Sequence, residues 1–157
     1  MSDISAPSGD IDRVAAELAA RLPALHRALD RRVASTYPHP KPPEGQLLLL
    51  KFVARQEGAT VREAAEALLM KPNNVSALVS QLTVLGLLER RRDSADKRVA
   101  HLHLTATSRR RLTEVGDLET AFLAEALRSL TEGEMGALGA ALDALGSLTR
   151  HLHTAVN

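Results

Sequence analysis

Apolar residues near the N-terminal end recur every three or four positions. They are Ile11, Val14, Leu18, Leu22, Leu25, Leu29 and Val33. This spacing predicts a helix over residues 10–37 with one continuous apolar stripe. Pro23 lies within that stripe, and we expect it to kink the helix or to split it in two. Residues 1–9 contain Ser, Pro and Gly and no such period, so they are predicted to be a disordered tail.

The middle of the chain, residues 43–105, begins with two predicted helices. Residues 44–56 are apolar almost all round, which predicts a buried helix. Thr60 and Glu63 have the spacing of a capping box, so a short second helix is expected to begin there.

A third helix is predicted from Pro72 to about Leu85, because proline suits the first position of a helix. Its apolar residues fall on one side, at Val75, Leu78, Val79 and Leu82. The residues on its other side share short, uncharged side chains: Asn73, Asn74, Ala77, Ser80 and Gln81. Such a face is compatible with close approach to another surface, and amide side chains can pair with adenine in the DNA major groove.

Two segments, 87–92 and 99–104, read as strands that follow Gly86 and flank a polar turn, and the second of them shows alternation. They predict a β-hairpin. The order helix, turn, helix, hairpin is that of a winged helix-turn-helix over residues 43–105. The fold class is therefore mostly α with a small β-hairpin wing.

Two long helices are predicted after the hairpin. Thr105 is placed to cap a helix that extends to about Ser129, and Thr131 with Glu134 forms a second capping-box pattern before the last helix. That helix carries a heptad seam at Met135, Leu138, Leu142, Leu145, Thr149 and Leu152. Its glycines, Gly136, Gly139 and Gly146, suggest that a neighbouring backbone approaches closely.

Apolar stripes at both ends of the chain favour packing of these ends together and against a second copy. Residues 10–37 and 106–157 are thus predicted to form a helical dimerisation domain. The candidate contact residues are Ile11, Val14, Leu18, Met135, Leu138, Leu142, Leu145 and Leu152.

Charge is distributed unevenly. Residues 61–111 hold ten Lys or Arg and five Asp or Glu, whereas the remainder holds ten and fourteen. The net charge of +1 therefore hides a basic middle, which is typical of a nucleic-acid-binding segment.

Composition excludes several classes of function. The chain has no cysteine, so disulfides, thiolate metal sites and thiol redox switches are excluded. It has no apolar run long enough for a membrane span and no secretory leader pattern, so a cytoplasmic protein is expected. No nucleophile–base pattern, paired carboxylates or phosphate-binding glycine loop is present, which argues against an enzyme, and no cofactor is expected.

The residues from Leu68 to Thr105 resemble the multiple-antibiotic-resistance regulator (MarR) family. The similarity is carried by Val75–Leu82, Leu85–Arg90, Asp93 with Asp96-Lys97-Arg98, and Leu104-Thr105. The resemblance implies a homodimeric transcription factor, usually a repressor released by a small-molecule effector. It also implies that Arg98 enters the minor groove of DNA and that Asp96 braces it. Lys71 and Ala77 depart from the family pattern, which commonly has a Ser or Thr cap and a basic residue at these positions.

The residues expected to contact DNA are therefore Lys71, Asn73, Asn74, Ser76, Ala77, Ser80, Gln81, Arg90, Arg91, Arg92, Asp96, Lys97 and Arg98. Arg90 to Arg92 are interpreted as phosphate contacts, the alternative being a solvated strand. For Asn73 and Asn74, base contact and local capping are equally good interpretations. Arg109 to Arg111 either contact DNA or cover the start of a helix.

The histidine pair His101 and His103 has metal-ligand spacing on a strand, but no third ligand is visible. We therefore interpret both as exposed wing residues, and no metal site is predicted.

By resemblance, an effector is expected where the dimerisation helices meet the DNA-binding lobe. This would involve His26, Tyr37, Phe52 and Phe122, which are equally compatible with core or loop positions. The sequence thus predicts a dimeric, ligand-responsive regulator that binds a pseudo-palindromic operator in double-stranded DNA. The alternative is an architectural or interaction protein of the same fold without ligand control.

Overall fold

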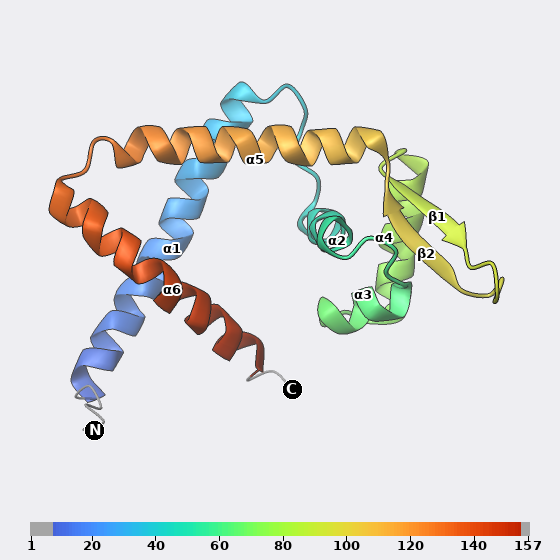
Figure 1. Ribbon diagram of the computed structural model, residues 1–157, viewed down its shortest axis with the longest axis horizontal. Coiled ribbons are helices and arrows are strands. Elements are labelled where there is room, and N and C mark those ends of the chain that lie inside the picture. Colours follow the sequence, from blue (N-terminus) through green and yellow to red (C-terminus); the bar gives the residue numbers. More distant parts are fainter. Residues whose placement is uncertain (1–7, 155–157) are drawn as a thin grey trace. The chain divides into compact units, whose positions relative to one another are not determined.

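The computed structural model describes residues 8–154, which form six helices and one two-stranded sheet (Figure 1). In chain order the elements are α1 (Ser8–Thr36), α2 (Glu44–Arg55), α3 (Val61–Ala67), α4 (Pro72–Val84), β1 (Leu88–Arg92), β2 (Ala100–Leu104), α5 (Ala106–Leu127) and α6 (Glu132–Thr154). The chain divides into two compact units between Glu119 and Thr120, within α5. This division does not test the expected grouping of the terminal helices, because that grouping depends on a second chain.

The first helix differs from expectation in two ways. It begins at Ser8, so the last residues of the predicted 1–9 tail are helical, and residues 1–7 lie outside the described residues. Pro23 lies inside this single 29-residue helix, so the predicted split does not occur. A proline removes one backbone donor from a helix, and the other hydrogen bonds of a long helix can hold it together.

The core of the first unit lies in the lobe formed by α2, α3, α4 and the hairpin (Figure 1). Its buried residues are Leu49, Leu50, Val53, Ala64, Ala65, Val75, Val79, Leu82, Leu87, Leu88, Leu102 and Leu104. The all-round burial predicted for α2 is wrong, because Leu48 is 45% exposed. A helix packed on one side of a small lobe buries only that side, whatever its other side carries.

The predicted helix starts are confirmed by their hydrogen bonds. The Glu63 backbone N–H donates to the Thr60 hydroxyl (3.2 Å), and the Thr60 N–H donates to the Glu63 carboxylate (2.7 Å). Thr131 and Glu134 repeat the arrangement before α6. The Ser108 N–H donates to the Thr105 hydroxyl at the start of α5.

The turn between α3 and α4 contains a leucine in the left-handed region. Leu69 has φ = 53°, and the Met70 N–H donates to the Ala65 carbonyl at 2.9 Å, which closes the end of α3. Glycine normally occupies such a helix-ending position, because a Cβ makes the left-handed conformation costly. The turn therefore places α4 at the expense of local backbone strain.

The hairpin is antiparallel, with Leu88 opposite Leu104 and Arg92 opposite Ala100. Gly86 (φ = 67°) ends α4, and the Leu87 N–H donates to the Leu82 carbonyl. The chain thus reverses directly from the second helix of the motif into the first wing strand. The predicted winged helix-turn-helix is confirmed.

The second unit comprises the end of α5 and α6. None of the residues of α6 is buried, and four apolar positions of its predicted seam are exposed by 44–66%: Met135, Leu138, Leu142 and Leu152. A Cβ added at Gly136 or Gly139 meets no atom of residues 8–154 within 4 Å, its own helical turn apart. The close approach that we expected at these glycines is therefore not made by the described part of this chain.

Candidate nucleic-acid interface

The second helix of the motif, α4, is oriented by its apolar side. Val75, Val79 and Leu82 are fully buried. Lys71 precedes Pro72 as the N-cap residue and makes no side-chain cap hydrogen bond, as its identity predicted. This orientation leaves the face opposite the core exposed at Asn73, Asn74, Ala77, Ser80 and Gln81, with Ser76 half-buried.

Neighbouring elements hold two side chains on the exposed face of α4. The Arg90 guanidinium of β1 donates to the Ser80 hydroxyl (3.2 Å) and to the Ser76 carbonyl (3.4 Å), and the Ser80 hydroxyl donates to that same carbonyl. Gln46 of α2 hydrogen-bonds to the Gln81 side-chain amide at 3.1 Å. Arg90 therefore joins the wing to α4, a role that its position in a basic triplet did not reveal.

Asn73 and Asn74 lie at the start of α4. Among the described residues, neither side chain has a hydrogen-bond partner, so neither caps the helix. Their amides are available for contact with bases or phosphates.

The wing turn is organised by Asp93. Its Oδ1 accepts hydrogen bonds from the backbone N–H groups of Ala95 (2.7 Å) and Asp96 (3.1 Å). Asp96 in turn accepts from the backbone N–H of Arg98 at 3.0 Å. The resemblance implied that Asp96 braces the Arg98 side chain, whereas in the described part of the chain it fixes the Arg98 backbone and leaves the guanidinium unpaired.

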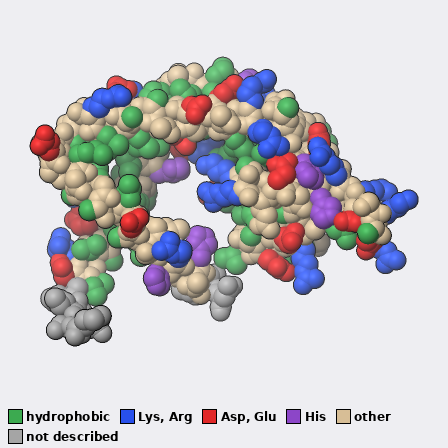
Figure 2. All heavy atoms as spheres, viewed as in Figure 1, with side chains coloured by type: hydrophobic (Ala, Val, Ile, Leu, Met, Phe, Trp, Pro, Cys, Tyr) green, Lys and Arg blue, Asp and Glu red, His purple; other side chains and the backbone are tan. Residues whose placement is uncertain are grey.

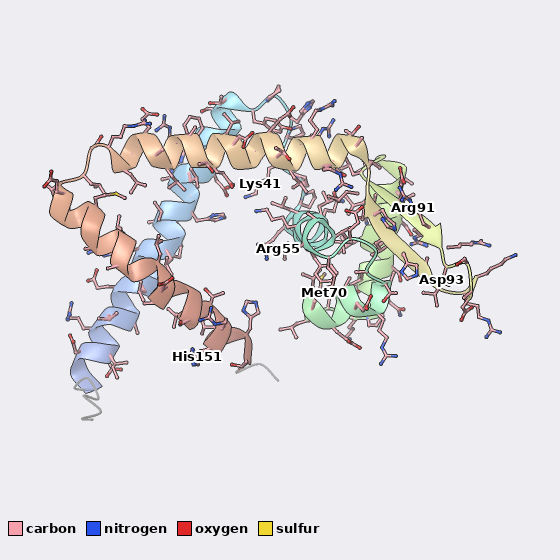
Figure 3. All side chains as sticks on the ribbon, viewed as in Figure 1. Lys41, Arg55, Met70, Arg91, Asp93 and His151 are labelled. Carbon is pink, nitrogen blue, oxygen red and sulfur yellow. The ribbon has the colours of Figure 1, made fainter. Side chains whose placement is uncertain are left out.

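Basic side chains gather over the end of the hairpin (Figure 2). Arg91 extends from β1, where it pairs with Glu89 at 3.2 Å (Figure 3). Arg92, Lys97 and Arg98 are exposed and, among the described residues, have no side-chain ion-pair partner. These three charges remain available to an external anion.

A shallow hollow lies between α3 and the wing. It is lined by Thr60, Val61, Arg62, Arg90, Arg98, Val99 and Ala100. Arg62 was not among the predicted site residues, although it lies two positions after the capping Thr60; it pairs with Glu66 at 3.0 Å. Three guanidinium groups on one concave surface form an electrostatically favourable site for a phosphate.

The two wing histidines are not the freely exposed residues that we expected. The ring nitrogens of His101 lie 2.7 Å from the Gly58 carbonyl oxygen and 2.9 Å from Asp93 Oδ2. His103 contacts Glu57 at 3.2 Å, and its side chain is only 19% exposed. Alternation along β2 places both rings on the side that faces the loop between α2 and α3, and sequence alone could not show that this loop lies there.

These contacts shift the pKa values of Asp93, His101 and Glu57. The hydrogen bond from His101, with two backbone N–H donors, lowers the pKa of Asp93 to about 2. The Asp93 carboxylate and then the Gly58 carbonyl raise the pKa of His101. Arg109, followed by His103, lowers the pKa of Glu57.

The basic triplet at the start of α5 has a mixed role. Arg109 pairs with Glu57 (3.1 Å) and Arg110 lies 3.7 Å from Glu114. Arg111 is half-buried, and its Nε has no partner among the described residues. Arg109 therefore links α5 to the α2–α3 loop, whereas the Arg110 pair lies within α5 itself.

The candidate effector residues line neither the hollow between α3 and the wing nor a second hollow formed by Gln46, Ser80, Gln81, Val84 and Leu85. Tyr37 donates a hydrogen bond to Glu114 (3.0 Å), and His26 lies 3.3 Å from Asp30. Phe52 packs against the lobe core, and Phe122 is a half-buried residue of the second unit.

The candidate dimerisation residues are largely exposed in the single chain. Ile11 and Val14 are 58% and 43% exposed, and Leu142 is 66% exposed. Leu18 and Leu145 are half-buried. Exposed leucines at helical spacing on both terminal helices form apolar surface that one chain by itself does not cover.

Two negative findings apply to residues 8–154. They contain no cluster of three or more His, Cys, Asp or Glu side chains that could hold a metal ion. None of their helices is both long enough and apolar enough to cross a membrane.

Comparison with known proteins identifies a family for the middle of the chain. Residues 41–99 match the MarR family. A protein from Pseudomonas aeruginosa PA01, described as a transcriptional regulator, is 26% identical with a TM-score of 0.72, and the match covers 92% of this chain and 98% of that one. No curated protein matches the sequence.

Two more distant structures share the fold. FabT from Streptococcus pneumoniae, solved in complex with DNA, is 19% identical with a TM-score of 0.70 over 90% of this chain and 99% of that one. MepR from S. aureus, solved with bound ethidium bromide, is 20% identical with a TM-score of 0.62 over 83% and 95%.

Proposed function

The chain belongs, through residues 41–99, to the MarR family of transcriptional regulators, and from this premise we propose that it is a cytoplasmic homodimer that represses transcription at a pseudo-palindromic operator. Proteins of this family are regulators and not enzymes. The observation that carries the proposal is the pairing of an exposed, uncharged α4 face with an arginine-bearing hairpin on one lobe. A helix of this kind fits the major groove, and an arginine-tipped hairpin fits the adjacent backbone and minor groove.

In this arrangement Asn73, Asn74 and Gln81 read base edges. Ala77 allows the helix to approach closely, because its side chain is short. Lys71, Arg91, Arg92 and Lys97 bind phosphates, and Arg98 probes the minor groove. Ser76 and Ser80 act with Arg90 to set the angle between helix and wing, because their hydrogen bonds already connect the two elements.

Dimerisation is supported by the exposed apolar residues of α1 and α6. One recognition helix reads only a few base pairs, so two copies related by a two-fold axis are needed for a specific site. The same symmetry predicts an operator with two similar half-sites about one helical turn apart.

A small-molecule effector is also proposed to control operator binding. MepR, which shares the fold, was solved with ethidium bromide, and this chain has polar and aromatic candidates for a site in His26, Tyr37 and Phe52. Phe122 remains a further candidate. A ligand that lowers operator affinity would support this part, whereas an architectural protein would bind DNA without regard to any ligand.

The test is a footprint on the DNA flanking the protein's own gene, followed by titration with the protected duplex. Arg98→Ala should weaken binding about tenfold and reduce the dependence of log affinity on log salt concentration by about one. Arg21→Ala is the matched control, because it removes the same charge from α1, where Arg21 pairs with Glu17. Equal affinities for both variants, or a lack of protection anywhere, would refute the proposed interface.

A further inference from the structure

The imidazole ring of His101 lies between two groups that can only accept hydrogen bonds. Nδ1 is 2.7 Å from the Gly58 carbonyl oxygen, and Nε2 is 2.9 Å from Asp93 Oδ2. A neutral imidazole has one N–H, so it can donate to only one of these oxygens. Both hydrogen bonds form together only when the ring is a protonated imidazolium.

Charged groups around the ring favour that proton. Asp93 contacts the ring directly, and Glu63, which closes the capping box of α3, acts on it from a greater distance; both raise the pKa of His101. Arg91 lies opposite His101 on β1, where its charge is paired with Glu89.

The loop between α2 and α3 contributes one more carboxylate near this side of β2. Glu57 is held by His103 and by Arg109, so its charge is already balanced. Asp93 and Glu63 are therefore the charged groups that act on the His101 ring, and both favour its protonated form.

The two acceptors of His101 belong to different parts of the lobe. Gly58 lies in the loop that β2 already contacts through the hydrogen bonds Gly58 N–H to Leu102 carbonyl (2.9 Å) and Leu102 N–H to Ala59 carbonyl (2.8 Å). Asp93 is the first residue of the wing turn and orders it through the N–H groups of Ala95 and Asp96. The ring thus connects the α2–α3 loop to the wing turn, the segment that carries Arg98 (Asp93 is labelled in Figure 3).

We propose that His101 is a positioning residue for DNA binding: its protonated ring clamps the wing turn to the α2–α3 loop, and loss of the proton releases the turn. The inference rests on the proposed function, because its consequence is a pH dependence of operator affinity. The neutral ring keeps a single N–H, so one of its nitrogens turns a lone pair toward either the Gly58 carbonyl oxygen or the Asp93 carboxylate, and this repulsion breaks the clamp.

The sign of the effect follows from proton linkage. Because the pKa of His101 is raised in the folded protein, the clamp is fully formed below the ordinary histidine pKa of 6.5 and is lost as the pH rises through the raised value. Operator affinity should therefore fall as the pH rises through the raised pKa of His101.

The first experiment needs no DNA and no variant. Nitrogen-15 spectra of the histidine rings of the whole protein should show His101 protonated on both nitrogens at pH 6, with a midpoint above 6.5, and amide exchange of Ala95 and Asp96 should accelerate through the same midpoint. Asp93→Asn should lower that midpoint. A singly protonated ring at pH 6, or wing exchange that ignores the titration, would overturn the clamp.

The second experiment measures operator affinity between pH 6 and pH 9 at constant ionic strength. The operator affinity of the wild type should fall as the pH rises. The fall should be about tenfold for each unit by which the clamp raises the pKa of His101. His101→Gln, which cannot titrate, should lack this component, whereas His103→Gln should retain it, because His103 contacts Glu57 and not Asp93. The same pH dependence in wild type and His101→Gln would overturn the proposal.

The two experiments separate the inference from the function on which it rests. If no duplex is bound at any pH, the proposed function is wrong, and the ring titration still decides whether the proton holds the wing. If DNA binds but the His101 ring is neutral, the proposed function stands and the clamp is refuted.

Discussion

The leucine at the end of α3 allows a quantitative test of how the helix-turn-helix is formed. Leu69 has φ = 53° and is 60% exposed, so its side chain contributes little burial while its backbone is strained. We compare Leu69→Gly with Leu69→Ala. Both variants remove the leucine side chain beyond Cβ, so the difference between them isolates the backbone.

Two terms determine that difference. The left-handed conformation costs a residue with a Cβ about 1–2 kcal/mol, and glycine avoids this cost. Glycine loses more conformational entropy on folding, which costs roughly 0.5–1 kcal/mol relative to alanine. The structure therefore predicts that Leu69→Gly is more stable than Leu69→Ala by about 0.75 kcal/mol, the difference between the midpoints of the two ranges.

The control is Ala67→Gly, for which we expect the opposite change in the free energy of unfolding. Ala67 is the last residue of α3 and is exposed, so Ala67→Gly should destabilise the protein by about 0.5–1 kcal/mol. Urea unfolding followed by circular dichroism at 222 nm, at one protein concentration, measures all the variants on the same scale. If Leu69→Ala proves as stable as Leu69→Gly or more stable, residue 69 is not left-handed in solution, and the described geometry of the turn is wrong.

Three further perturbations follow from the described contacts. Thr60→Ala removes the capping box with Glu63 and should cost about 1 kcal/mol in urea unfolding; Thr60→Ser should restore most of it, and equal losses in the two variants would reject the cap. Leu142→Glu places a charge on the exposed seam of α6 and should give monomers by light scattering, with weaker operator binding; dimers that persist would reject the seam. The stabilisation that Asp93 provides relative to Asp93→Asn should be present above pH 4 and disappear as the pH falls from its ordinary pKa of 3.8 to about 2, because the pKa of Asp93 is lowered in the folded state; a difference in unfolding midpoint that does not change across this window would contradict the Asp93 hydrogen bonds.

Local sequence determined those features of the protein that depend on neighbouring residues. The capping boxes at Thr60 and Thr131, the proline at the start of α4 and the buried side of α4 all appear where the pattern placed them. Each is governed by hydrogen bonds or burial within a few residues, so the order of the elements, and with it the winged helix-turn-helix, was readable from the chain.

Contacts between distant segments could be assigned only in three dimensions. His101 and Gly58 are 43 positions apart, and Arg90 reaches Ser80 across the junction of helix and strand. The resemblance implied that Asp96 braces the Arg98 side chain. In the structure Asp96 accepts a hydrogen bond from the Arg98 backbone instead, and Asp93 accepts one from the Asp96 backbone and so orders the turn. Sequence periodicity gives the direction of a side chain relative to its own element, but the partner that it meets depends on how elements far apart in the chain pack together, and this the tertiary structure alone decided.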